Sequence, residues 1–395
     1  MNDLDFKGAD QLPIGTKDKP FTGILDGNGF SISNYQLQQI ESSTHFGLFA
    51  YAKNATFRNF QIKDTRLTIG NDWNLELYGG LLLGQGESVT IENIQIASSV
   101  SVAIQPLFKS TVGGIVGELK GTSLKPSNVY NVLNSGEISG KYRIGGIVGS
   151  ASYTKIESAK NYGVIKGGDS AGGIVGYLFQ SKLFQAENDG DIKSTQSSGG
   201  IVGNASYSIV EIALNKGFVQ SSGSWSDVGG IIGFMRKTNL TDAKNTGSFS
   251  GKGSQTDIGG LVGDAGQESI IRNGMNQSDI ITSDSSIGGI VGEVYQSLIQ
   301  QTYNEGDLSG STGGGISSAI SNSVIQNSFN IGKIQGSVTS GGLVGYAYQD
   351  SRIESSYNSG FVRRSYLHGA LAGKYEGTMQ SVYGITQSRL IGEGE

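Results

Sequence analysis

Short alternations of apolar and polar residues recur along the chain with a period of about 28 residues. The first landmark of each copy is a Gly-Gly-apolar-apolar-Gly motif. It begins at Gly113, Gly145, Gly172, Gly199, Gly229, Gly259, Gly288 and Gly341, with weaker copies at Gly79, Gly314 and Gly369. Alternation over so few residues, bounded by Gly, Ser and Asn, predicts short strands and not helices.

An Asn-x-Gly landmark follows the glycine motif in most copies, at Asn134, Asn161, Asn188, Asn215, Asn245, Asn304, Asn330 and Asn358, with Asn276-Gln-Ser as a variant. The residue five positions before each Asn is aliphatic, and the residue four positions after it is apolar, as Ile156 and Ile165 are around Asn161. Each copy is therefore expected to form three short strands that turn their apolar side chains inward.

One copy cannot bury its apolar side chains alone, but stacked copies can if each strand pairs with its counterpart one coil on. The sequence thus predicts an all-β fold, a right-handed parallel β-helix of about 11 or 12 coils. Residues 1–112 are expected to form divergent N-terminal coils with side loops, and residues 113–373 the regular helix. Residues 374–395 are expected to form its C-terminal end or the start of a following domain.

The two landmarks have expected structural roles. The Asn column is expected to adopt the left-handed conformation in a turn and to hydrogen-bond from coil to coil. The glycine pair is expected to permit a sharp corner or close packing across a narrow interior.

Composition narrows the functional classes. The chain has 63 Gly, 4 Pro and no Cys among 395 residues, with a formal net charge of −5. The absence of Cys excludes a disulfide scaffold, thiol catalysis and Cys-ligated metals. The acidic balance argues against nucleic acid as a partner. No stretch approaches about 18 consecutive apolar residues, so we expect no membrane insertion.

The recurring Gly-Gly-Ile-Val-Gly resembles the GLUG repeat of bacterial surface proteins. The segments beginning at Leu25 (LDGNGFSISN), Gly47 (GLF) and Ala55 (ATFRNFQI) are similar to the region that precedes the catalytic domain of streptococcal IgA1-specific zinc metallopeptidases. The resemblance implies a β-helix in an extracellular setting, secreted or attached to the cell wall. Neither His45 nor His368 lies in the H-E-x-x-H motif of those peptidases, so their proteolytic activity is not implied.

Paired carboxylates are the candidate metal ligands. Asp227 and Asp257 both lie two residues before a glycine pair on neighbouring coils, where two close carboxylates would favour a cation. A weak Ca²⁺ site is one interpretation, and solvated surface charge and a catalytic pair are the others. No other cofactor is expected.

Aromatic residues are the candidate ligand contacts. Tyr303, Phe329 and Tyr357 each precede an Asn landmark on consecutive coils, and Trp225 lies in a lengthened loop over residues 218–228; Trp73 lies in another loop. An exposed aromatic row suits sugar rings or a partner protein, and the alternative is stacking that stabilises the coils.

Together these features predict a non-catalytic extracellular β-helix module that serves adhesion, ligand display or spacing. Its expected partners are a host glycan or host protein and further domains of the same polypeptide. The alternative is a polysaccharide-active β-helix enzyme, a lyase or hydrolase, with its acids and a base on one outer face.

Overall fold

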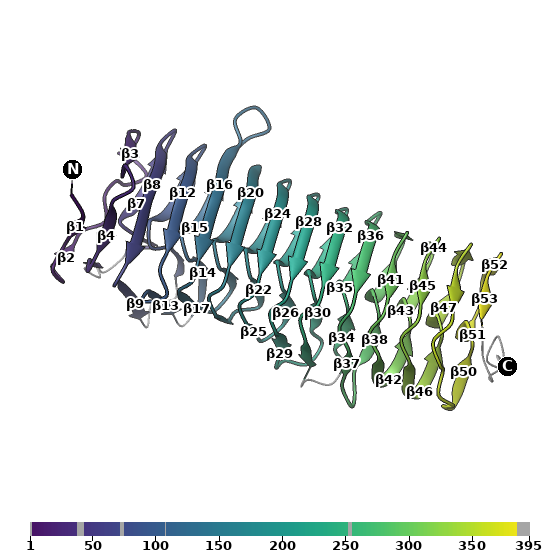
Figure 1. Cartoon of the computed structure of the whole chain (residues 1–395). Helices are drawn as coiled ribbons and strands as arrows, with labels where there is room; N and C mark the ends of the chain where they lie inside the picture. The colour runs from purple at the N-terminus through teal and green to yellow at the C-terminus, as the bar shows by residue number, and fades with distance from the viewer. Residues whose placement is uncertain (1, 38–42, 72–74, 107, 252–254, 385–395) are drawn as a thin grey trace. The chain divides into compact units, whose positions relative to one another are not determined.

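The computed structural model describes residues 2–37, 43–71, 75–106, 108–251 and 255–384. In these residues parallel strands, with no helix, stack into a β-solenoid of about 13 turns with roughly 28 residues per turn (Figure 1). The predicted all-β parallel β-helix is therefore confirmed. The turns exceed the expected 11 or 12, and near the N-terminus β3 (Ile24–Asp26) and β4 (Ser31–Ser33) already pair in parallel with β8 (Thr56–Lys63). Among the residues described, no helix has the length and apolar character needed to cross a membrane.

The chain divides into two compact units. The first comprises Met1–Ser194 with Ile201–Gly203, and the second comprises Thr195–Gly200 with Asn204–Glu395. This division falls within the regular repeats. The boundaries expected after residues 112 and 373 stay a prediction.

A typical turn of the first unit contains four strands, where the sequence pattern predicts three. They are β14 (Lys109–Gly113), β15 (Val116–Lys120), β16 (Ser127–Asn134) and β17 (Glu137–Gly140). Each pairs in parallel with its counterpart in the next turn: β18 (Arg143–Gly145), β19 (Val148–Ser152), β20 (Thr154–Asn161) and β21 (Ile165–Gly167). The extra strand arises because the glycine pair forms a corner that separates β14 from β15.

The first turns of the second unit are likewise divided into four strands. One turn contains β30 (Asp227–Gly229), β31 (Ile232–Arg236), β32 (Asn239–Asn245) and β33 (Phe249–Gly251). Later in this unit the strand that ends at the landmark Asn splits into β40 (Leu298–Gln300) and β41 (Tyr303–Asn304). The next two segments there merge into β42 (Leu308–Gly314), which pairs with β46 (Ile334–Gly341).

The interior of both units is filled by the aliphatic columns that the pattern predicted. Ile156 and Ile165 in the first unit and Ile299 and Ile334 in the second are fully buried. The landmark Asn side chains lie in the same interior and have no exposed surface. Each buried Asn amide therefore needs hydrogen-bond partners inside the protein.

The Asn side chains satisfy one another. In the first unit Asn134 Nδ2 donates to Asn161 Oδ1 and Asn161 Nδ2 donates to Asn188 Oδ1, both at 2.7 Å. In the second unit the same bond, 2.8 to 3.0 Å long, links Asn215, Asn245, Asn276, Asn304, Asn330 and Asn358 in succession. The second hydrogen of each amide goes to the carbonyl two residues on, such as Gly163 O from Asn161 and Gly306 O from Asn304. The predicted hydrogen-bonded Asn column is confirmed, and we call it the Asn ladder.

The expected left-handed conformation of these Asn residues is wrong. The positive φ values lie instead three residues earlier, at Asn131, Ser158, Gln185, Ile212, Asp242, Asn273, Gln301, Asn327 and Ser355. The landmark Asn ends a strand with its side chain inward, so its own backbone stays extended. The bend occurs at an outward position instead.

The landmark glycines are required by this ladder. A Cβ on Gly146 would lie 2.6 Å from Asn161 Oδ1 and within contact distance of the Gly173 carbonyl oxygen in the next turn. A Cβ on Gly163 would lie 2.6 Å from Asn134 Nδ2. Both expected roles of the glycines, a corner and close interior packing, are therefore observed together.

Replacing Asn304 by Ala is expected to destabilise the second unit. The change removes the bonds from Asn276 and to Asn330 and Gly306, and it leaves these buried groups without partners. Each such group costs about 1–3 kcal/mol, so the free energy of unfolding should fall by roughly 3–5 kcal/mol. Denaturant unfolding followed by circular dichroism measures this. Gln300→Ala, an outward position in the same turn, is the control. A loss no larger than that of the control would contradict the role of the ladder.

Candidate functional site

Two columns of outward side chains face one another across the glycine corner in the first unit. The first column occupies the position two residues before the corner glycine: His45, Tyr78, Thr111, Arg143 and Ser170. The second column lies on the strand after the corner: Tyr51, Gln85, Glu118, Ser150 and Tyr177. We call these sets the facing columns. Because the corner is tight, side chains of the two columns come into contact, as His45 and Gln85 do.

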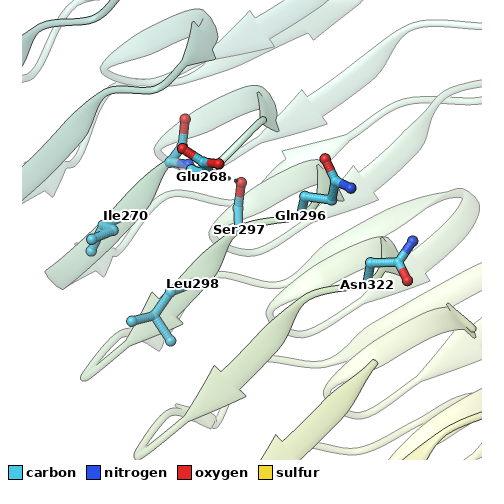
Figure 2. A pocket seen from close by; sticks show the side chains of 7 residues that line it. Glu268, Ile270, Gln296, Ser297, Leu298 and Asn322 are labelled. Carbon is cyan, nitrogen blue, oxygen red and sulfur yellow. Dashed lines mark hydrogen bonds between the residues drawn. The ribbon is translucent and has the colours of Figure 1, made fainter. Parts of the chain in front are cut away.

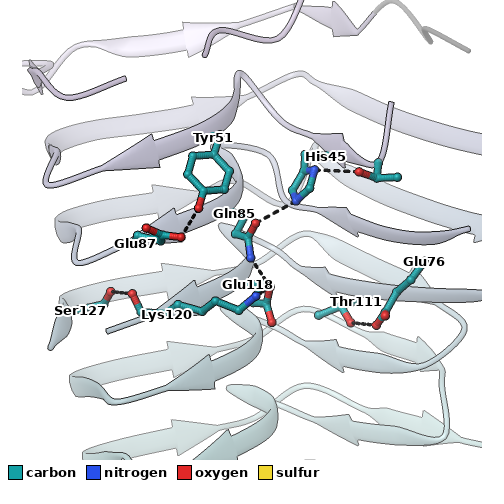
Figure 3. Close-up of polar contacts among 10 residues, drawn as sticks. His45, Tyr51, Glu76, Gln85, Glu87, Thr111, Glu118, Lys120 and Ser127 are labelled. Atoms are coloured by element: carbon teal, nitrogen blue, oxygen red, sulfur yellow. Dashed lines mark hydrogen bonds and ion pairs between the residues drawn. The ribbon is translucent and has the colours of Figure 1, made fainter. Parts of the chain in front are cut away.

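A chain of hydrogen bonds joins the columns in the first unit (Figure 3). Gln85 Nε2 donates to Glu118 Oε2 at 2.5 Å, and Gln85 Oε1 lies 3.0 Å from His45 Nε2. Since the Gln85 oxygen faces the ring, Nε2 of His45 carries the proton. Nδ1 then accepts from the Thr44 hydroxyl, which lies 2.9 Å away. Lys120 Nζ neutralises Glu118 at 2.8 Å.

Burial lowers the pKa of His45, which keeps the ring neutral at pH 7. The ring also stacks on Tyr78, with centroids 5.1 Å apart. Both ring nitrogens already have partners, so this network orients side chains and leaves no free base. The sequence analysis gave these residues no role, because the period of the repeat does not give the direction of the strand after the corner.

The facing columns of the second unit hold carboxylates. Asp227 on β30 is the register partner of Asp257 on β34 (Asp257–Gly259), as predicted from their shared position. Asp264 on β35 (Val262–Gly266) and Glu293 on β39 (Val291–Tyr295) are register partners in the opposite column. The sequence analysis missed these two because they lie beyond the corner.

Burial is the main cause that raises the pKa of three of these carboxyl groups. The pKa of Asp227 rises to about 6, that of Asp257 to about 7 and that of Asp264 to about 8. Repulsion from Glu293 and from one another adds to the effect, while Arg236 on β31 lowers the pKa of Asp264. The Ser197 hydroxyl donates to Asp227 at 3.1 Å. The cluster thus holds protons near neutral pH.

The predicted Ca²⁺ site at Asp227 and Asp257 stays a prediction. Ca²⁺ takes 6–8 oxygen ligands, several of them carboxylate. In the part of the chain that the structure describes, no group of three or more His, Asp or Glu side chains is placed to hold a metal ion.

The candidate aromatic residues lie together in the second unit. Tyr303, Phe329 and Tyr357 are register partners in successive turns, and Tyr383 continues the column. The rings of Tyr303 and Phe329 stack with centroids 4.9 Å apart and planes 9° apart, and those of Phe329 and Tyr357 are 5.1 Å and 4° apart. We call these three residues the aromatic ladder.

Stacking covers both ring faces of Phe329 and one face each of Tyr303 and Tyr357. A sugar ring binds an aromatic residue on its face, and both faces of Phe329 are occupied by its neighbours. Solvent therefore meets Phe329 at its ring edge, whereas Tyr357, at the end of the stack, is 42 % exposed. This geometry favours cross-turn stabilisation, while a ligand contact at the edges stays a prediction.

The tryptophan candidates stand apart from these residues. Trp225 is 74 % exposed and has a φ of +59°, in the loop between β29 (Val219–Ser221) and β30. Its role in ligand contact stays a prediction. Trp73 lies outside the described residues.

A pocket of about 500 Å³ lies at another corner of the second unit. Figure 2 shows Glu268, Gln296 and Asn322 on successive turns beside Ile270 and Leu298. Glu268, Gln296 and Asn322 all have positive φ, so the pocket follows the bend before the strands β36 (Ile270–Asn276) and β40. The carboxylate in its lining, that of Glu268, pairs with Lys237 at 4.0 Å. The lining residues therefore do not suggest a catalytic or metal-binding role.

The carboxyl cluster predicts a pH-dependent stability of the second unit. A carboxyl of the unfolded chain titrates near pH 3.9, whereas these groups hold their protons to about pH 6–8 in the folded state. Their stabilising contribution is full below the unfolded pKa and is lost as pH rises from about 4 to about 8. Asp264→Asn should therefore raise the stability at pH 8, by on the order of 2 kcal/mol, and flatten the profile.

Denaturant unfolding from pH 4 to pH 9 measures this dependence. Asp307→Asn is the matched control, because Asp307 is exposed and pairs with Lys333 at 3.2 Å. An unchanged pH profile in Asp264→Asn would contradict the coupling within the cluster.

The aromatic ladder predicts a measurable coupling between turns. A double-mutant cycle of Tyr303→Ala and Phe329→Ala should give a coupling free energy of about 0.5–1.5 kcal/mol, because the two rings stack directly. The non-adjacent pair Tyr303 and Tyr357 should give a smaller value. Equal, near-zero couplings in both cycles would refute stacking as a source of stability.

Comparison with known proteins supports one part of the resemblance. The family described as "Glug: The GLUG motif" matches residues 336–362, which extend from β46 to the residue two positions after Gly360. No curated protein matches the chain significantly. The chain is thus similar to GLUG-repeat proteins in its repeat and its β-solenoid fold, and no relative supports the resemblance to the IgA1-specific peptidases.

Proposed function

We propose that the chain is a non-catalytic extracellular β-helix module of a bacterial surface or secreted protein, which serves adhesion, ligand display or spacing. The observation behind this proposal is the use of the repeated residues. The landmark Asn residues form the Asn ladder, as Asn161 does, and the landmark Gly residues form the corner, as Gly146 does. Repetition therefore maintains a scaffold, and the residues that vary lie on its outside.

The extracellular setting rests on the resemblance to GLUG repeats of bacterial surface proteins. The matched segment is one repeat, and the other copies of the Gly-Gly-apolar-apolar-Gly motif extend the likeness along the chain. A rigid stack of short turns suits display because outer side chains at one position recur at the strand spacing of about 4.8 Å.

A polysaccharide-active enzyme is the second candidate, and the carboxyl cluster favours it. A general acid for sugar chemistry needs a carboxyl group that keeps its proton near neutral pH. Asp257 and Asp264, with pKa values near 7 and 8, have this property, and Glu293 lies beside them. Such a site would belong to the second unit.

Two measurements separate these functions. For a display module, immunoblotting of the source organism should find the protein in the cell-wall fraction or culture fluid, and uronate polymers should gain no reducing ends or unsaturated products. Confinement to the cytoplasm would contradict the extracellular proposal. Release of new ends that Asp264→Asn abolishes would establish the enzyme instead, with Asp307→Asn as the control.

A further inference from the structure

A row of alternating aromatic rings and cations lies in the first unit. Lys109 Nζ is 5.5 Å from the ring centroid of Phe108 and 4.1 Å from that of Tyr142. The guanidinium carbon of Arg143 is 4.9 Å from the Tyr142 ring and 4.1 Å from the Tyr177 ring. We call these five residues the cation–aromatic array.

The glycine corner assembles this array from three turns. Arg143, on β18, belongs to the first facing column and is the register partner of Thr111 on β14. Tyr177, on β23 (Val175–Phe179), belongs to the opposite column one turn later and is the register partner of Ser150. Lys109 lies two residues before Thr111 on the same strand. The backbone register therefore places the two cations one turn apart and two residues apart along the strand direction.

Several other cations of this unit pair with carboxylates, whereas those of the array do not. Lys53, Lys120, Lys155 and Lys166 pair with Glu87, Glu118, Glu157 and Glu137 at 2.8 to 3.0 Å. Neither Lys109 nor Arg143 has a carboxylate within 4.0 Å among the residues that the structure describes.

The array leaves hydrogen-bond donors available. Arg143 carries five N–H donors, and the bond described for them is to the Tyr142 hydroxyl at 3.4 Å. The aromatic rings hold both cations in place, and they compensate the positive charge only weakly. The array is therefore a pre-organised pair of positive charges with unused donors.

We propose that the cation–aromatic array binds an acidic polysaccharide. Carboxylate or sulfate groups on neighbouring sugar residues would pair with Arg143 and Lys109, and C–H faces of the sugar would contact the aromatic surface, of which Phe108 is 46 % exposed. Arg143 and Lys109 are offset by one turn and by two residues along the strand, so a polymer that carries several anionic groups can pair with both. This inference rests on the proposed display function and names its ligand class.

The test compares the binding of the whole chain to defined polymers. The probes are polygalacturonate, its neutral methyl ester, dextran sulfate and poly-glutamate, measured by isothermal titration calorimetry at 50 mM and 500 mM salt. We expect polygalacturonate or dextran sulfate to bind at least tenfold more tightly than the neutral ester, with weaker binding at high salt. The stronger of the two identifies the anionic group.

The variant Lys109→Gln/Arg143→Gln should lose at least tenfold in affinity for the preferred polymer. Lys155→Gln is the matched control, because Lys155 also lies over a ring, that of Tyr130 at 5.5 Å, but is paired with Glu157. It should bind as the unchanged protein does. Circular dichroism and the unfolding midpoint verify that the variants fold.

Three results would overturn the proposal: equal affinity in the double variant, no binding of either acidic polysaccharide, or preference for poly-glutamate, which would indicate an acidic peptide. Cleavage of polygalacturonate would instead refute the non-catalytic function. Because cleavage and affinity are measured separately, either proposal can fail while the other stands.

Discussion

The hydrogen bond between one buried Asn side chain and the next is the constraint on which the rest of the structure depends. An amide without partners in the interior would cost about 1–3 kcal/mol for each unmet group. The ladder meets this demand only if every turn places its Asn directly beside the next, as Asn276, Asn304 and Asn330 are. Any slip in register would break a bond in two neighbouring turns, so the ladder fixes the register of each unit.

The glycines follow from the same constraint. The Asn side chains occupy the space where Cβ atoms of the corner glycines would lie, as at Gly146 beside Asn161. A residue without a side chain is needed there, and the chain can then turn within a few residues. This tight corner brings the two facing columns into contact. An interior polar interaction thereby decides which outer side chains meet.

Sequence periodicity predicted the features that repeat once per turn. The neighbours of Asp227, Tyr303 and Asn161 along the stack follow from the period alone, and the structure has them as predicted. Features that depend on the angle of the corner could not be predicted in this way. The meeting of Asp227 with Asp264 and of Arg143 with Tyr177 needs the direction of the strand after the corner.

The sequence pattern also could not predict how the aromatic rings are oriented or which residue adopts the left-handed conformation. The pattern left open whether the aromatic ladder contacts a ligand or stacks between turns, and identical positions in consecutive turns are close enough for the rings to cover one another. The left-handed residue was placed at the Asn because Asn tolerates that conformation. The structure has it at whichever residue bends the strand, even at Ile212. Backbone geometry here outweighs residue preference.

In a stacked fold each outer side chain has its counterpart about 4.8 Å away in the next turn. The charge at one position therefore acts directly on the charge at the same position of the neighbouring turn. In the first unit Gln85 separates His45 from Glu118, and Lys120 neutralises that carboxylate. In the second unit Asp227 and Asp257 are direct partners, and their pKa values rise. The scaffold does not require the like charges of Asp227 and Asp257 to lie side by side. It also does not require the cations of the cation–aromatic array to lack a carboxylate partner. Such positions are where selection for binding or chemistry, and not for folding, would act.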